Sequence, residues 1–261
     1  MTVKIIASDL DGTLLQNGNR EVSKKAIEYI KALNEKNVIF AAASGRQYQN
    51  LRKLFHEVKD DIAYICENGG FVKYHDEIIY KKTMDRTMGE EILDDIYSIE
   101  GCEFLLSGEN VSYIKPKDKE YSSHIQYFVG NDICLIDDYK EVKEDFIKIS
   151  VYCKDGIEKH GKYFEEKWGD KVKTTISGYS WLDLVAPEVN KGEALKKLME
   201  KFNVTYEETM CFGDNYNDLD MFDVSYYSYA MTGANREIRN RARFVTPDVE
   251  SILFDVNMIY Q

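Results

Sequence analysis

Short apolar runs alternate with stretches of helical periodicity at both ends of the chain. The first two runs lie at residues 3–7 and 38–43, and each is short and uniformly apolar, which is typical of buried parallel strands. Between them, apolar residues recur at helical spacing behind a serine suited to cap a helix, at Ser23, Ala26, Ile27, Ile30 and Leu33. The pattern predicts βαβ units in a doubly wound parallel sheet, an α/β fold.

The middle of the chain shows a mixed pattern, and regular alternation resumes near its end. Further strands are expected at residues 62–66, 71–74, 78–80, 103–106, 146–152, 173–176, 209–212 and 226–230. Further helices are expected at residues 48–57, 88–99, 119–128, 157–168 and 191–202, with one more from about Asp218. We therefore predict a core formed by residues 1–82 and 186–261, with an α+β domain inserted at residues 83–185.

Charge and hydropathy exclude several classes of function. The chain has 34 Lys and Arg residues against 46 Asp and Glu, a net charge of -12, which argues against a nucleic-acid partner. The longest apolar stretch, residues 38–43, is far shorter than the roughly 20 residues that span a bilayer, and no secretion signal is visible. We expect a cytoplasmic protein that does not bind membranes and is a monomer or weak homodimer.

The five cysteines lie far apart and include no C-x-x-C pair. An odd number of scattered cysteines is typical of reduced, mostly buried thiols rather than of a disulfide framework or a zinc site. They are Cys66, Cys102, Cys134, Cys153 and Cys211.

The most specific chemical signal is Asp9-Leu10-Asp11-Gly12-Thr13, at the end of the first expected strand. Residues two apart on an extended chain point the same way, so Asp9 and Asp11 are expected to project together above the sheet edge. Two carboxylates held close raise each other's proton affinity unless a cation lies between them. The pair could supply one ionised nucleophile and one proton carrier. A bare D-x-D is common in solvated loops, but its place after an apolar strand favours catalysis.

Ser44-Gly45-Arg46 lies where the second strand ends and a helix is expected to begin. A hydroxyl and exposed helical N–H groups suit a phosphate, although an ordinary serine N-cap is an alternative. Ser44 and the Gly45 amide are better candidates than Arg46, whose guanidinium could instead pair with a carboxylate.

Lys191 opens the helix expected at residues 191–202. A cation there opposes the helix macrodipole by about 0.3–1 kcal/mol. A bound anion would remove that conflict, while the alternative is a solvated surface lysine.

The run Gly213-Asp214-Asn215-Tyr216-Asn217-Asp218 follows another expected strand. Asp214 and Asp218 are four residues apart, so a loop turning into a helix could bring both to one side, and their oxygens suit Mg²⁺. The alternative is a turn with Asn217 or Asp218 as a helix N-cap. Two unit charges about 4 Å apart interact by roughly 4 kcal/mol at an effective dielectric of 20. An anionic Asp9 could therefore approach a phosphate only with Mg²⁺ and Lys191 present.

These four motifs, in this order, resemble those of the haloacid dehalogenase (HAD) superfamily, in particular its Cof-type phosphatases of subclass IIB. Glu67-Asn68-Gly69-Gly70 also resembles the Asn-Gly segment that precedes the cap in that family. The resemblance implies that the insertion at residues 83–185 is a cap that closes over the site, excludes water and selects the substrate.

The resemblance also implies a role for each motif residue. Asp9 would form an aspartyl-phosphate, while Asp11 would protonate the leaving group and then deprotonate the hydrolytic water. The implied metal ligands are Asp9, Asp11 through its carbonyl, and Asp214, with Asp218 in support. The implied phosphate-binding residues are Leu10, Ser44, Gly45, Lys191 and Asn217, and Lys191 would also steady Asp9.

The implied activity is Mg²⁺-dependent hydrolysis of small phosphomonoesters such as sugar phosphates and related metabolites. A phosphosugar mutase of the same superfamily is an alternative, as is a sugar-phosphate sensor without turnover, although a sensor would not need Asp11. Aromatic residues of the insertion could contact a substrate, but packing or surface roles are expected for most of them: Tyr113, Tyr121, His124, Tyr127 and His160.

Overall fold

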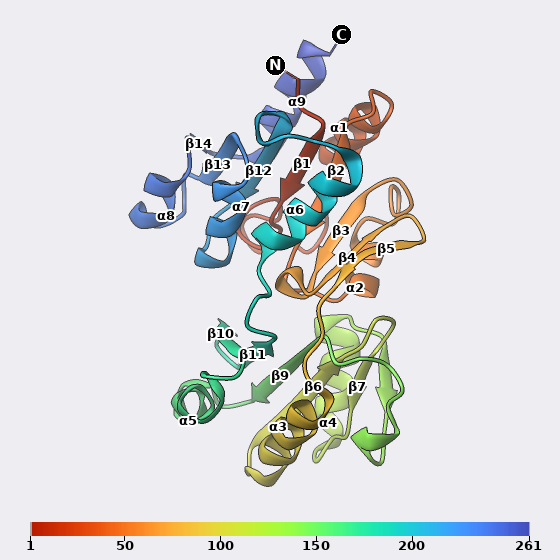
Figure 1. The fold of residues 1–261 in the computed structure, drawn as a ribbon, viewed down its shortest axis with the longest axis vertical. Coiled ribbons are helices and arrows are strands. Elements are labelled where there is room, and N and C mark those ends of the chain that lie inside the picture. The colour runs from red at the N-terminus through yellow and green to blue at the C-terminus, as the bar shows by residue number, and fades with distance from the viewer. Residues whose placement is uncertain (1, 261) are drawn as a thin grey trace. The chain divides into compact units, whose positions relative to one another are not determined.

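The computed structural model describes residues 2–260, which divide into two compact units. The first unit contains Leu51–Tyr80 together with the chain before Gln47 and after Val189. The second contains Lys81–Val189 and the short stretch Gln47–Asn50. Each unit is built on a sheet of its own (Figure 1). The assignment of residues 83–185 to a substrate-selecting cap stays a prediction.

The first unit contains an eight-stranded sheet in the order β14-β13-β12-β1-β2-β3-β4-β5. Its strands are β1 (Ile5–Ser8), β2 (Ile39–Ala43), β3 (Ala63–Cys66), β4 (Phe71–Tyr74), β5 (Glu77–Lys81), β12 (Thr209–Gly213), β13 (Tyr227–Met231) and β14 (Phe244–Thr246). The strands from β14 to β3 pair in parallel, and only the β3–β4 pair is antiparallel among the registers determined. The predicted parallel α/β core is confirmed.

Helices follow the strands of this sheet in the expected alternation. They are α1 (Lys24–Asn34), α2 (Tyr48–Leu54), α6 (Lys191–Phe202), α7 (Leu219–Asp223), α8 (Arg236–Arg241) and α9 (Val249–Ile259), with short helices η1 (Glu67–Gly69), η4 (Tyr206–Glu208) and η5 (Tyr216–Asp218). Ser23 caps α1 as predicted, since its side chain accepts a hydrogen bond from the Ala26 N–H.

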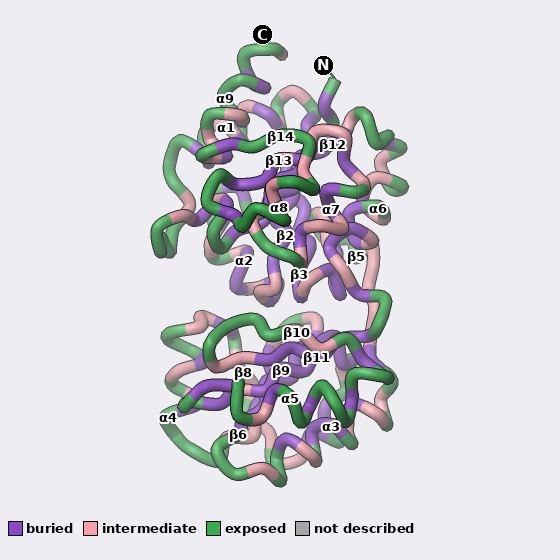
Figure 2. The backbone as a smooth tube through the Cα atoms, turned by 90° about the vertical axis from the view of Figure 1, so that its left-hand side faces the viewer, coloured by how far each residue is buried: buried purple, intermediate pink, exposed green. Residues whose placement is uncertain are grey.

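Both faces of the central strands are buried, as expected for a parallel sheet covered by helices on each side. On β1, Ile5 and Ala7 share a hydrophobic cluster with Leu195 of α6 and Met221 of α7. Ile6 points to the opposite face and is also fully buried. Figure 2 shows this burial along the strands of the unit. The sheet is therefore a rigid support for residues at its edge.

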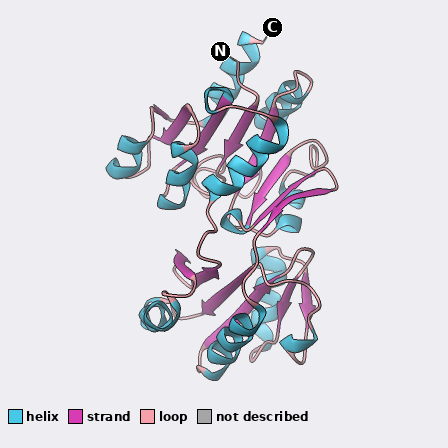
Figure 3. Cartoon of the chain, viewed as in Figure 1, coloured by secondary structure: helices cyan, strands magenta, loops and turns pink. Residues whose placement is uncertain are grey.

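The second unit contains a six-stranded sheet in the order β10-β11-β9-β6-β7-β8 (Figure 3). Its strands are β6 (Cys102–Ser107), β7 (Ser112–Ile114), β8 (Ile133–Leu135), β9 (Lys148–Cys153), β10 (Lys173–Gly178) and β11 (Trp181–Val185). Its helices are α3 (Arg86–Ser98), α4 (Lys119–Ser123), η2 (His124–Val129), η3 (Tyr139–Glu141) and α5 (Glu158–Trp168). All its strand pairs are antiparallel except β7–β8. The predicted α+β insertion is confirmed.

Several elements were not predicted from the sequence. Strands β7, β8 and β14 have three residues each, too few for an alternating pattern to stand out. In β11, the buried Asp183 interrupts the apolar run. Helices α8 and α9 were also not predicted. Both follow β13, the last element expected from the sequence.

The helices of residues 2–260 are short. The longest, α3, has 13 residues, whereas a span of the bilayer needs about 20. Within this part of the chain, no helix combines the length and apolarity that crossing a membrane requires.

Candidate active site

The carboxyl ends of β12, β1 and β2 meet at one edge of the first sheet. Ser8, the last residue of β1, is in register with Phe212 of β12 and Ala42 of β2. Asp9 therefore emerges between the loops that follow the two neighbouring strands. Because β2 lies on one side of β1 and β12 on the other, the edge at Asp9 is a topological switch point, where open α/β sheets bind ligands.

Lys191 connects two of the predicted carboxylates. Its Nζ lies 2.6 Å from Oδ1 of Asp9 and 2.7 Å from Oδ1 of Asp218, and its side chain has no exposed surface. The alternative of a solvated surface lysine is therefore wrong. Burial favours a lower pKa for Lys191, but the negative charges of Asp218 and Asp9 outweigh it and raise the pKa above its ordinary value. The side chain is held as an ammonium ion.

Asp9, Asp214 and Asp218 form a compact acidic cluster, with one oxygen of each within 4.8 Å of the others. Burial, followed by the charge of Asp218, raises the pKa of Asp9 to about 8. Burial also raises the pKa of Asp214. Three carboxylates beside the single ammonium of Lys191 leave two negative charges unbalanced when all are ionised. A divalent cation would balance them, and carboxylate oxygens are ligands that hard cations prefer, so these residues fit a divalent metal.

Asp218 also shapes the loop that carries Asp214. Its Oδ2 accepts hydrogen bonds from the backbone N–H groups of Asp214 at 2.9 Å and Asn215 at 3.0 Å. Asn215 and Asp218 together cap η5, and the Asp218 side chain makes no capping hydrogen bond to α7. Asp218 thus fixes Lys191 with one oxygen and the metal-site loop with the other.

Two residues of the first motif fit closely against Asp214. Thr13 is buried, and its hydroxyl donates a hydrogen bond of 2.9 Å to Oδ1 of Asp214. Gly12 has a φ of 93°, and a Cβ there would lie 2.4 Å from Oδ2 of Asp214, so only glycine fits this turn. The sequence interpretation did not include Thr13 among the site residues, although its position directly after the Asp-Gly turn is a signal that could have identified it.

Asp11 has different surroundings from Asp9. The first strand ends before Asp9, and the chain then turns at Leu10, whose carbonyl accepts the Thr13 N–H. The extended conformation therefore ends before Asp11, and the expectation that the two aspartates project together above the sheet edge stays a prediction. The Asp11 side chain is 60% exposed and forms a two-point ion pair with Arg46, at 2.6 Å and 3.0 Å. Arg46 thus pairs with a carboxylate, as the sequence had left open.

Asn68 joins the second and fourth motifs. Its Oδ1 accepts a hydrogen bond of 3.1 Å from Nδ2 of Asn217, and its backbone N–H donates to the Ser44 carbonyl. A Cβ on Gly45 would lie 3.1 Å from the Asn68 amide. Asn68 has a left-handed φ of 56°, a conformation that Asn tolerates better than most residues. The Asn-Gly sequence singled out this segment, but it did not indicate that Asn68 contacts Asn217.

The remaining predicted phosphate-binding groups are polar atoms at the same strand ends. The Ser44 Oγ accepts the Arg46 N–H at 3.2 Å, which leaves the hydroxyl proton able to donate. Leu10 is fully buried, so only its backbone could serve a ligand.

Nearly the whole chain is similar to known proteins. The model of the haloacid dehalogenase-like hydrolase family matches residues 6–251. The 5-amino-6-(5-phospho-D-ribitylamino)uracil phosphatase of Escherichia coli (strain K12) is 24% identical over 245 residues, covering 94% of this chain and 90% of that protein. A crystal structure from Eubacterium rectale is 27% identical, with a TM-score of 0.87, and the match covers 97% of this chain and 99% of that one.

The structure of a HAD subclass IIB sugar phosphatase has a TM-score of 0.79 at 20% identity, covering 98% of this chain and all of that one. At that identity the likeness concerns the fold. The family model, in contrast, spans nearly the whole sequence and all four motifs. The chain belongs to the haloacid dehalogenase-like hydrolase family and is a phosphatase of that family.

Proposed function

We propose that this phosphatase hydrolyses sugar phosphates and related small metabolites with Mg²⁺, and that Asp9 accepts the phosphoryl group. The observation that carries the proposal is the buried contact of Lys191 with both Asp9 and Asp218, inside a cluster with two unbalanced negative charges. Such a cluster fits a site that brings an anionic phosphate to an anionic nucleophile.

The proposed metal ligands are Asp9, Asp214 and the backbone carbonyl of Asp11, with Asp218 in support. When bound, Mg²⁺ would neutralise charge on the carboxylates and on the phosphate oxygens. Thr13 and Asp218 would keep the Asp214 loop in position for this role.

Asp9 is the proposed nucleophile. Lys191 donates a hydrogen bond to its Oδ1, and we take Oδ2 as the attacking oxygen. A bond forms from this oxygen to phosphorus while the bond from phosphorus to the leaving oxygen breaks. Water then attacks the phosphorus, and the carboxylate of Asp9 leaves.

Asp11 is the proposed proton carrier. It donates a proton to the leaving oxygen in the first step and takes one from water in the second. Its exposed side chain is accessible to a substrate, but Arg46 pairs with its ionised form. Asp11 can carry a proton only after this pair opens, so we expect substrate binding to displace Arg46.

The phosphate oxygens would be held by several donors. These are the Ser44 hydroxyl, the backbone N–H groups of Leu10 and Gly45, the Asn217 amide and Lys191. The ammonium of Lys191 has three N–H groups, and its two contacts to Asp9 and Asp218 leave one for the phosphate. Asn68 would orient the Asn217 amide.

The test is to assay the purified protein with para-nitrophenyl phosphate. We expect release of nitrophenol with Mg²⁺ and its loss with EDTA. A binding protein without turnover would release none under either condition. A mutase would instead transfer the phosphoryl group back to its product rather than to water.

A panel of phosphorylated metabolites would then identify the substrate class. The E. coli relative is named for a phosphorylated ribitylamino compound, so phosphorylated sugar alcohols belong in the panel beside hexose and pentose phosphates. We expect the highest kcat/KM in these groups. A preference for phosphopeptides would contradict the proposed class.

A further inference from the structure

Two cysteines of the second unit lie against each other in the centre of its sheet. Cys102 begins β6, Cys153 ends β9, and the two are directly opposite in the antiparallel register. Their sulfur atoms are 3.0 Å apart, and both side chains are buried. The sequence interpretation missed this contact because 51 positions separate the two residues.

The backbone geometry at this pair suits a covalent link. The Cys153 N–H donates to the Ser180 carbonyl and the Cys102 N–H to the Ile99 carbonyl, so these N–H groups do not join the two cysteines. Opposite residues that do not exchange backbone hydrogen bonds have Cα atoms about 4.5 Å apart. That separation lies within the range of about 4.4–6.8 Å that a disulfide spans.

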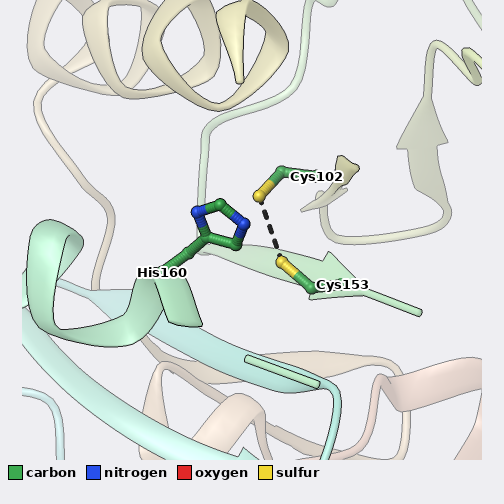
Figure 4. A group of neighbouring side chains, drawn as sticks. All are labelled: Cys102, Cys153 and His160. Atoms are coloured by element: carbon green, nitrogen blue, oxygen red, sulfur yellow. Dashed lines mark hydrogen bonds between the residues drawn. The ribbon is translucent and has the colours of Figure 1, made fainter. Parts of the chain in front are cut away.

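His160 of α5 completes a group of three. One of its ring nitrogens and the two sulfurs lie within 4.8 Å of one another, and Figure 4 shows a ring nitrogen facing the sulfurs. The hydrogen bond between the two sulfurs, which either thiol could donate, lowers the pKa of Cys102, although burial partly offsets it. The same hydrogen bond, with burial, raises the pKa of Cys153. Cys102 is the thiol that we take as the attacking group.

The surroundings favour a disulfide over a metal ion. Both cysteines belong to an apolar cluster that includes Phe104, Val151 and Phe164, where an uncharged disulfide needs no polar partner. The sulfur separation of 3.0 Å lies between the S–S bond length of about 2.05 Å and the roughly 3.8 Å between two thiolates on one tetrahedral Zn²⁺, so the choice depends on the other ligands. The group also offers only three ligands among residues 2–260, whereas structural zinc sites use four.

We propose that Cys102 and Cys153 form a reversible disulfide between β6 and β9 when the protein meets a peroxide. This modification site is independent of the proposed phosphatase residues.

The chemistry balances with the peroxide as oxidant. The Cys102 thiol gives its proton to a base such as His160, and the thiolate attacks a peroxide oxygen. The O–O bond breaks, leaving a sulfenic acid on Cys102 and releasing water or an alcohol. The Cys153 sulfur then attacks the Cys102 sulfur, the S–O bond breaks, and the thiol proton of Cys153 leaves with the hydroxyl as water. The two thiols lose two electrons, and the peroxide gains two.

The test uses the full-length, fully reduced protein treated with hydrogen peroxide and then alkylated in denaturant. Before alkylation we expect a mass loss of about 2 Da, corresponding to two hydrogens. The number of cysteines that can be alkylated should fall from all five of the chain to three. Peptide mapping should link Cys102 to Cys153, and dithiothreitol should reverse the link. The disulfide should raise the Tm of the second unit by a few degrees, because it restricts the unfolded chain.

Cys102→Ala should abolish the mass loss, whereas Cys134→Ala should retain it. Cys134 is a matched control because it lies in the same unit, on β8, and is half-buried. Should Cys102→Ala fail to fold, the peptide map of the wild type decides alone. Five alkylated cysteines after oxidation, or a link between other cysteines, would overturn the proposal. A metal site would also overturn the proposal. It would show as a sulfur-to-metal absorption band with Cd²⁺ that is absent in Cys102→Ala, together with resistance of the wild-type cysteines to oxidation.

Discussion

Each unit of the molecule buries a lysine against an aspartate, and the two pairs differ in charge balance. In the first unit, Lys191 contacts Asp9 and Asp218, with Asp214 close by. In the second, Lys148 of β9 lies 3.5 Å from Asp183 of β11. The Ser150 hydroxyl also donates to Asp183, at 2.6 Å, so this single carboxylate has both a cation and a neutral donor.

The comparison shows that burial alone does not distinguish a reactive site. Both lysines are nearly inaccessible, but Lys191 lies beside a cluster of three carboxylates, whereas the carboxylate beside Lys148 is that of Asp183. A balanced buried pair has a structural role and often adds little net stability. A cluster with excess negative charge favours a bound cation or proton. Burial and then the charge of Asp218 raise the pKa of Asp9, and perturbed carboxylates of this kind are typical of functional sites.

The same substitution in both pairs tests this contrast most strongly. Asp9→Asn removes the nucleophile, so we expect kcat on para-nitrophenyl phosphate to fall by about 10⁴-fold or more, with the fold retained. Asp183→Asn removes the carboxylate beside Lys148, so it should lower the free energy of unfolding by about 3 kcal/mol and leave kcat nearly unchanged. Steady-state kinetics and urea unfolding give both results. Equal losses of activity would contradict the distinction between the pairs.

Asp11→Asn removes the proton carrier but leaves the acidic cluster intact. We expect kcat to fall by roughly 10²–10⁴-fold, with a smaller loss for substrates whose leaving group needs no proton, such as nitrophenol. Arg46→Met removes the ion-pair partner of Asp11 but leaves the proton carrier in place, so its effect on kcat should be far smaller. Unchanged kinetics in Asp11→Asn with an alkyl phosphate would mean that another group carries the proton.

Thr13→Val tests the support of the metal site. It removes the hydrogen bond to Asp214, so we expect the Mg²⁺ concentration for half-maximal activity to rise about 10-fold, with kcat at saturating Mg²⁺ little changed. Thr246→Val is the control, because the buried Thr246 hydroxyl donates to a backbone carbonyl instead. A shift of equal size in both variants would indicate a general loss of packing.

The pH dependence of stability is the subtlest test. The pKa of Asp9 is about 8 in the metal-free fold, against an ordinary value of 3.8, so the folded state binds this proton more tightly than the unfolded state. The resulting stability is present in full below pH 4 and is lost as the pH rises through 8. We expect the Tm of the metal-free protein to fall between about pH 4 and 8, and both Mg²⁺ and Asp9→Asn to reduce that fall. If the Tm of the wild type and of Asp9→Asn changed with pH in the same way, the raised pKa would not belong to Asp9.

Much of the first unit could be predicted from the sequence because its signals are local. Buried parallel strands are short apolar runs, and their carboxyl ends share one edge of the sheet. That rule brings Asp9 and Asp214 to one edge of the sheet, whereas Lys191 opens α6 and its place beside Asp9 was implied by the family resemblance. The expected cytoplasmic location and monomeric or weakly dimeric state remain predictions.

The features that were missed depend on long-range register or on local turns. The contact of Cys102 with Cys153 follows from the pairing of β6 with β9, which no local pattern specifies. The ion pair of Asp11 with Arg46 follows a turn at Leu10, after β1 has already ended at Ser8. Asn68 contacts both the second and the fourth motif from a left-handed backbone conformation. The Asn-Gly sequence is compatible with that conformation but does not indicate which residues Asn68 contacts.

Identification of the phosphorylated residue tests the central claim most directly. The enzyme would be mixed with saturating substrate and Mg²⁺, quenched in acid within milliseconds and reduced with borohydride, which converts an aspartyl-phosphate to homoserine. The account predicts homoserine at position 9 in the peptide map of the quenched enzyme. A phosphoryl group on a different side chain, from enzyme that is turning over, would contradict it.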